Sequence, residues 1–168
     1  MSHVLFLCTG NAARSVMGGA ALAAHLPDWE VTTAGTLVVE GQPMSWRTRA
    51  ALESVGLEVP SHRSRQATLD DLARATVVVA LAPEHVHWVR RTAPAAAPHT
   101  GTLRRLARHL PTGDAPLTER LARLRLDEVE LADWEEVVDP GGGDAEQFAA
   151  CAREVTDLVA RLAPRLVP

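Results

Sequence analysis

The feature that most constrains the fold of this chain is a strand signal, a short polar loop and a helix signal in immediate succession near the N-terminus. The apolar run 3–7 predicts a buried strand, and the alanine-rich residues 14–25 predict a helix. Residues 30–35, with β-branched side chains and a final glycine, predict a second strand. A strand–helix–strand unit of this kind forms two parallel strands joined by a right-handed crossover. We therefore expect an α/β fold.

The rest of the chain extends this pattern. The apolar run 76–81 predicts a strand buried on both faces, and the final helix places its apolar side chains on one stripe. A weak fourth strand is expected near 99–103, after a linker-like loop at 93–98. Further helices are expected at 45–55, 69–73, from Pro83 onward, at 117–126 and from Asp144 onward. Together these elements predict one domain, residues 1–168, built as a three-layer sandwich with a central four-stranded parallel sheet.

The first strand and the first helix are joined by the octet Cys8-Thr9-Gly10-Asn11-Ala12-Ala13-Arg14-Ser15, which we call the phosphate loop. A helix N-terminus favours the thiolate form of a cysteine, and successive backbone N–H groups in a tight loop attract anions. The guanidinium of Arg14 is a planar fork that holds two oxygens of a phosphate, and Ser15 is placed to donate a hydrogen bond to the sulfur. The alternative is that Cys8 is simply a small apolar residue of a core strand.

Composition and charge narrow the class of protein. The net charge of −4 gives no reason to expect a nucleic acid partner, and no apolar run approaches the length of a membrane span. The N-terminus lacks a signal-peptide pattern, so the expected location is cytoplasmic. The cysteines, Cys8 and Cys151, are too few for a disulfide scaffold and lack metal-ligand spacing. We expect neither a metal nor a cofactor, and the oligomeric state is left open.

A second chemical group is needed if the loop handles phosphate esters, because the departing oxygen requires a proton donor. Asp139 is the candidate, since it follows a plausible extended segment and Pro140 restricts its backbone to extended conformations. Three glycines follow, which suits a close-approaching loop. The alternative is an ordinary turn, because Asp-Pro-Gly is a common turn sequence.

These motifs, in this order, resemble the low-molecular-weight protein tyrosine phosphatases. The resemblance rests on the phosphate loop, Thr33-Ala34-Gly35-Thr36, His62-Arg63-Ser64-Arg65-Gln66 and Val138-Asp139-Pro140 before the last helix. It implies a phosphomonoester hydrolase that acts through a cysteinyl-phosphate intermediate on a phosphorylated protein or a small phosphomonoester. It also implies the role of each site residue. Cys8 is the nucleophile, Arg14 binds the phosphoryl oxygens, Ser15 stabilises the thiolate, Asp139 is the general acid and base, residues 9–15 bind phosphate, and Asn11 holds the loop with Thr33 and His62.

The departures from the family pattern concern the substrate. Ala13 stands where the family usually has a second cysteine, Ala12 is smaller than the residue common there, and Gly141 and Gly142 stand where tyrosines are frequent. The walls for a phosphotyrosine ring are therefore reduced, unless Trp46 or Trp134 replaces them. Phosphotyrosine, phosphoarginine and small phosphate esters all stay open as substrates.

Two other functions fit the same loop. Arsenate reduction through a small-molecule thiol is one, since the only other cysteine is Cys151, which we interpret as a core residue of the last helix. A non-catalytic phosphate-binding module is the other, although such a module needs neither a thiolate nor an acid. The arginines at 104, 105 and 108 are interpreted as a solvated face.

Overall fold

The computed structural model describes residues 2–168 and confirms the α/β fold with a four-stranded parallel sheet. The strand order is β2-β1-β3-β4, and every neighbouring pair is parallel. The strands are β1 (His3–Cys8), β2 (Glu30–Gly35), β3 (Val77–Ala80) and β4 (Thr100–Thr102). The weak fourth strand is therefore real, although only three residues long.

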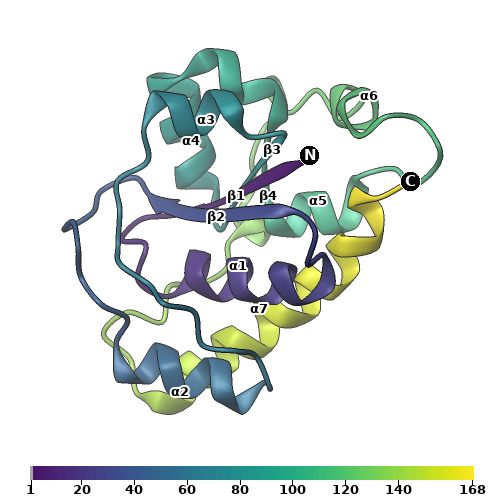
Figure 1. Ribbon diagram of the computed structural model, residues 1–168. Helices are drawn as coiled ribbons and strands as arrows, with labels where there is room; N and C mark the ends of the chain where they lie inside the picture. Colours follow the sequence, from purple (N-terminus) through teal and green to yellow (C-terminus); the bar gives the residue numbers. More distant parts are fainter. Residues whose placement is uncertain (1) are drawn as a thin grey trace.

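Helices cover both faces of this sheet (Figure 1). One side carries α3 (Leu69–Arg74) and α4 (Pro83–Thr92), and the other carries α1 (Arg14–His25), α5 (Leu103–His109) and α7 (Ala145–Leu166), against which α2 (Trp46–Ser54) packs. The remaining elements are the 3₁₀ helices η1 (Pro94–His99) and η2 (Asp133–Glu135) and the short helix α6 (Leu117–Ala122). None of the described helices is long and apolar enough to cross a membrane.

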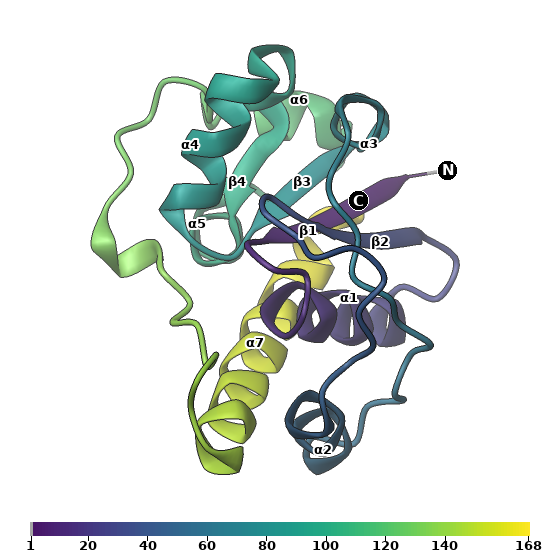
Figure 2. The same ribbon diagram turned by 90° about the vertical axis from the view of Figure 1, so that its left-hand side faces the viewer.

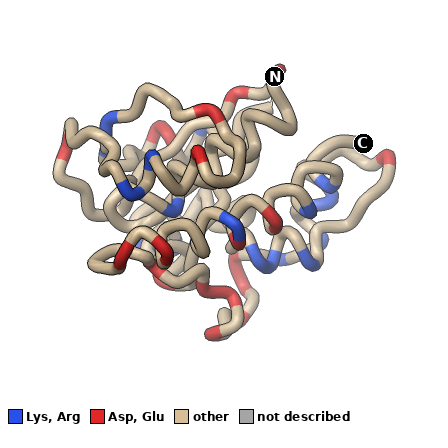
Figure 3. Tube along the Cα trace, turned by 90° about the horizontal axis from the view of Figure 1, so that it is seen from below, with Lys and Arg blue, Asp and Glu red and all other residues tan. Residues whose placement is uncertain are grey.

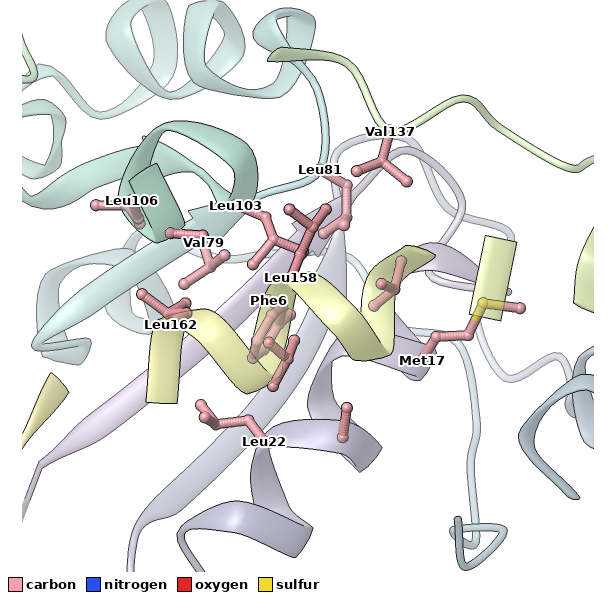
Figure 4. Packing of buried hydrophobic residues seen from close by; sticks show 14 of the residues in the cluster. Phe6, Met17, Leu22, Val79, Leu81, Leu103, Leu106, Val137, Leu158 and Leu162 are labelled. Carbon is pink, nitrogen blue, oxygen red and sulfur yellow. The ribbon is translucent and has the colours of Figure 1, made fainter. Parts of the chain in front are cut away.

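The two faces of β1 explain the three layers. Phe6 belongs to the apolar cluster shared with α1, α5 and α7, whereas Leu5 belongs to the cluster shared with α3 and α4. Phe6 lies among Leu22, Leu158 and Leu162 (Figure 4). A Cβ at Gly18 would lie 2.4 Å from the Phe6 ring, so α1 approaches the sheet this closely only because Gly18 has no side chain.

Two expectations about the middle of the chain were wrong, and one helix was missed. The segment 93–98 is not a free linker, because its prolines and alanines form η1 and bury Ala96 against the sheet. Helix α5 was missed; Thr102 caps it by accepting a hydrogen bond from Arg105 N. The helix expected at 117–126 ends at Ala122, because Arg125 adopts a left-handed backbone with φ of 49°.

The parallel strands bring the loops that follow β1, β2 and β3 to one edge of the sheet. The long segment after α6 runs down the side of the molecule to the start of α7 (Figure 2). It is fastened to the end of β3 where Val137 N donates to Leu81 O at 2.8 Å. This fastening brings residues near 139 to the edge that carries the phosphate loop.

Candidate active site

The phosphate loop turns from β1 into α1 around a buried asparagine. Asn11 has φ of 51°, a left-handed conformation that asparagine tolerates better than most residues. Its side-chain Nδ2 donates to Ser15 Oγ at 2.9 Å and to Thr33 Oγ1 at 3.0 Å, while its Oδ1 accepts from Arg65 N at 3.0 Å. Its backbone oxygen accepts from His62 Nε2 at 2.7 Å and from Ser64 Oγ at 3.0 Å. The structure thus places Asn11, Thr33 and His62 in one network that fixes the turn.

This network also orients the hydroxyl beside the sulfur. Ser15 Oγ lies 3.0 Å from Cys8 Sγ, and both residues are buried. Because Ser15 Oγ already accepts from Asn11, its own hydrogen is free to point at the sulfur. A hydroxyl hydrogen aimed at Cys8 favours the anionic form of the sulfur.

A guanidinium and a carboxylate face each other across the site. Arg14 is 3% exposed, and its Nη1 donates to Val137 O at 3.0 Å. Its Nη2 lies 3.6 Å from Asp139 Oδ2, and the Asp139 side chain is 58% exposed. Asp139 Oδ1 accepts from Gly141 N at 2.9 Å, which holds the carboxylate at the start of its loop. Arg14 therefore joins the phosphate loop to a segment more than a hundred residues away.

These groups share a cavity of about 270 Å³. The structure brings Cys8, Arg14 and Asp139 together there, with the sulfur end of the cavity next to the N-terminus of α1. Small residues form most of the remaining wall, and Phe148 from α7 closes it. The lining residues are Cys8, Gly10, Ala12, Ala13, Arg14, Ser45, Thr48, Asp139, Gly141 and Phe148.

Neighbouring loops hold the phosphate loop in position. Thr36 N donates to Cys8 O at 2.9 Å, and Thr48 Oγ1 donates to Ala12 O at 3.2 Å. Gly35 permits the first contact, because a Cβ there would lie 2.4 Å from Thr9 O. A Cβ at Gly10 would meet no atom within 4 Å, so the absence of a side chain there leaves the cavity wall open.

Sequence reasoning missed His85, a buried histidine of α4. Its Nε2 lies 2.9 Å from Thr9 Oγ1, so it ties the first residue after Cys8 to the opposite layer. Burial, and secondarily the positive charge of Arg14, lowers the pKa of His85 to about 3. The ring is therefore neutral at physiological pH. A histidine on a helix gives no signal of this contact, which spans 76 positions of sequence.

This neutral histidine predicts an acid-sensitive stability. Below pH 6.5 the unfolded chain protonates His85 but the folded chain does not until about pH 3, so its contribution is present above pH 6.5 and is lost as pH falls. Between pH 6.5 and 5 we expect a loss of about 2 kcal/mol in the free energy of unfolding. Urea unfolding of His85→Asn should show a flatter pH profile, whereas His87→Asn, an exposed change on the same helix, should keep the wild-type slope. Equal slopes in all three proteins would refute this role.

Two residues considered from the sequence lie outside this cavity. Trp134 packs beside Arg105, Arg108 and His109 on another face, so it forms no wall here. Cys151 is buried beside the Asp139 segment, with its Sγ 3.9 Å from Val138 O. Burial, then the nearby Glu154 carboxylate, raises the pKa of the Cys151 thiol to about 12, so it stays protonated and unreactive.

Comparison with known proteins identifies the family. The sequence pattern described as "Low molecular weight phosphotyrosine protein phosphatase" matches residues 3–167. The chain belongs to this family. A protein-arginine-phosphatase of Geobacillus stearothermophilus is 31% identical over 165 residues, 98% of this chain and 95% of the relative. The family resemblance is therefore confirmed, and the chain is a cysteine-dependent phosphatase of the low-molecular-weight class.

Solved structures agree with this assignment. The YwlE arginine phosphatase from Geobacillus stearothermophilus superposes with a TM-score of 0.79 at 30% identity, covering 99% of this chain and 93% of that one. A low molecular weight protein tyrosine phosphatase from T. tengcongensis gives a TM-score of 0.76 at 26% identity, covering 96% and 97%. The family thus contains relatives named for two different phosphorylated side chains.

Proposed function

We propose that this phosphatase removes phosphate from phosphorylated arginine side chains of proteins. The observation that carries the proposal is the lining of the Cys8 cavity, where the described residues include one carboxylate, Asp139, and a single aromatic ring, Phe148, with neither tyrosine nor tryptophan. A flat phenyl ring gains from aromatic partners, whereas the guanidine group of phosphoarginine gains from a carboxyl group that accepts its N–H hydrogen bonds and protonates the departing nitrogen. The relative that matches 98% of this chain is named a protein-arginine-phosphatase, which supports the same choice.

The first chemical step forms a bond between Cys8 Sγ and phosphorus. The thiolate attacks in line, the phosphorus–nitrogen bond breaks, and the departing guanidine nitrogen takes the proton of the Asp139 carboxyl group. Arg14 and the N-terminal N–H groups of α1 stabilise the negative charge on the transferring phosphoryl oxygens. The Ser15 hydroxyl favours the sulfur anion before the attack.

The second step releases phosphate. A water molecule attacks phosphorus and gives its proton to the Asp139 carboxylate, while the sulfur–phosphorus bond breaks and restores the thiolate. The same Ser15 hydroxyl then favours the departing sulfur anion, because it lies 3.0 Å from Cys8 Sγ. Asp139 ends the cycle protonated, ready for the next substrate.

The mouth of the cavity supports a protein substrate. Three large apolar side chains are strongly exposed on segments connected with the cavity residues: Leu37, Trp46 and Val138. Leu37 N donates to Thr9 O at 3.0 Å, Trp46 follows the cavity residue Ser45, and Val138 precedes Asp139. An exposed apolar rim of this kind suits contact with the surface of another protein. The cytoplasmic location expected from the sequence stays a prediction.

The test compares two peptides of identical sequence that carry either phosphoarginine or phosphotyrosine at the central position. We expect kcat/KM for the phosphoarginine peptide to exceed that for the phosphotyrosine peptide by at least about tenfold. A tenfold difference corresponds roughly to the free energy of one charge-assisted hydrogen bond. A phosphoserine peptide serves as the control for non-specific hydrolysis. A higher kcat/KM for phosphotyrosine would overturn the proposed substrate while leaving the family chemistry intact.

A further inference from the structure

A second hollow, larger than the cavity at Cys8, lies where α5, η2 and the C-terminal end of α7 meet. Its volume is about 650 Å³, and it shares no lining residue with the Cys8 cavity. We call it the arginine pocket. Its charged and polar lining residues are Arg104, Arg108, Thr112, Trp134, Arg161 and Arg165.

Positive charge exceeds negative charge at this pocket. Among the described residues, its lining comprises four arginines and no carboxylate, although the whole chain has a net charge of −4. Within residues 2–168, neither Arg108 nor Arg161 forms an ion pair, and both side chains are exposed. Arg104 pairs with Glu154, and Arg165 Nη1 donates to Leu110 O at 2.7 Å. Several basic segments lie on the side where the chain ends (Figure 3).

The wall of the arginine pocket is held in place by a buried ion pair. Arg105 donates from Nε to Glu135 Oε1 at 2.7 Å and from Nη2 to Glu135 Oε2 at 2.9 Å, and Glu135 is fully buried. The guanidinium of Arg105 lies 5.6 Å from the centre of the Trp134 ring, and that of Arg108 lies 5.2 Å from it. Arg105 is thus a structural residue, which corrects its interpretation as part of a solvated face, whereas Arg108 is exposed as expected.

The positive charge of the nearby arginines affects the pKa of His109. His109 meets the edge of the Trp134 ring at 6.2 Å between ring centres. Burial lowers the pKa of His109; Arg108, Arg105 and Arg165 lower it further, and Glu135 opposes them. Three arginines and one carboxylate therefore act on this ring, so most of the charged groups near the rim of the pocket are positive, which favours the approach of an anion.

We propose that the arginine pocket binds a small oligophosphate anion, with two or more phosphate groups held by Arg108 and Arg161. The hollow has the size of a small-molecule site rather than of a flat protein interface. Guanidinium groups match phosphate oxygens in pairs, and Arg165 adds positive charge from a position fixed by its hydrogen bond to Leu110 O. Because the guanidinium groups of Arg108 and Arg161 form no ion pair within residues 2–168, a ligand with more than one anionic group matches them best.

The probe is inorganic tripolyphosphate, titrated calorimetrically into the full-length protein while saturating orthovanadate abolishes phosphatase activity. Vanadate occupies the Cys8 cavity, so remaining binding reports the second site. We expect one bound tripolyphosphate per chain, weakened at least about thirtyfold in Arg108→Gln/Arg161→Gln, because two charge-assisted contacts are lost. The matched control Arg49→Gln/Arg91→Gln removes the same charge from exposed positions elsewhere and should change the affinity less than about twofold.

A second readout locates the ligand. Tripolyphosphate in the arginine pocket should raise the pKa of His109, followed by NMR of its ring protons, and shift the Trp134 indole resonance. The proposal is overturned if no binding remains in the presence of vanadate, or if both double variants weaken binding equally. It is also overturned if an oligoglutamate peptide binds there more tightly than tripolyphosphate, which would make the ligand an acidic protein segment.

Discussion

Replacing Cys8 by serine will lower kcat/KM by at least about four orders of magnitude for every phosphorylated substrate, because a serine hydroxyl is almost never ionised at neutral pH. The surrounding groups are arranged for a sulfur anion: Ser15 Oγ lies 3.0 Å from the sulfur and is itself oriented by Asn11. The substitution changes one buried atom, so the fold should persist. Initial rates with p-nitrophenyl phosphate and with a phosphoarginine peptide measure the effect, and circular dichroism checks the fold.

The matched control is Cys151→Ser, the same substitution at the other cysteine. Burial raises the pKa of that thiol to about 12, so Cys151 takes no part as a nucleophile and its replacement should leave kcat/KM within about threefold of wild type. If Cys8→Ser keeps substantial activity, or if Cys151→Ser loses activity to the same extent, the proposed nucleophile is wrong. If the protein reduced arsenate with a small-molecule thiol faster than it hydrolysed phosphate esters, arsenate reduction would again be a candidate function.

Replacing Asp139 by asparagine will lower kcat much more for substrates with poor leaving groups than for substrates with good ones. An amide donates no proton to a departing group, so kcat for a phosphoarginine peptide or an alkyl phosphate should fall by about 10²–10³-fold. An activated aryl phosphate needs little help from an acid, and its kcat should fall much less. Because the Asp139 side chain is 58% exposed, the free energy of unfolding should change little. Steady-state rates with the three substrates, each measured across pH, test this prediction.

Glu136→Gln is the control for Asp139→Asn, since Glu136 is an exposed carboxylate of the same segment. Glu136→Gln should leave the ratio of kcat for the alkyl phosphate to kcat for the aryl phosphate as in the wild type. If Asp139→Asn also kept the wild-type ratio, the proton would come from another group. The ion pair with Arg14 would then be the whole role of Asp139, and its loss would appear in KM rather than kcat.

The parts of the fold that sequence could predict are those with strong local signals. The strand 3–7, the phosphate loop and the following helix appear where expected, because an apolar run and an alanine-rich helix leave few alternatives. Helix α5 was missed because it is short and carries arginines, so its apolar positions Leu103 and Leu106 do not stand out. Its existence depends on burial against the sheet and on the cap at Thr102, which only the tertiary structure supplies.

In the active site, residues that lie in one loop could be predicted from the sequence, whereas contacts between distant segments could not. The sequence placed Cys8, Arg14 and Ser15 within one loop and offered Asp139 as the acid, and the family resemblance favoured that role over an ordinary turn. The pairing of His85 with Thr9 could not be predicted, because no periodicity or motif marks a contact across 76 positions. Asn11 was expected to hold the loop, yet the number of hydrogen bonds that it makes depends on where residues 62–65 pass in the folded chain.

The most direct test of the account is detection of phosphate on Cys8 during turnover. The enzyme is mixed rapidly with p-nitrophenyl phosphate, quenched in denaturant within milliseconds, digested and examined by mass spectrometry. We expect one added phosphate on the peptide that contains Cys8, in greater amount in Asp139→Asn, where water attack lacks its base. Full turnover with no phosphate on Cys8 in either protein, or with phosphate on another residue, would contradict the mechanism.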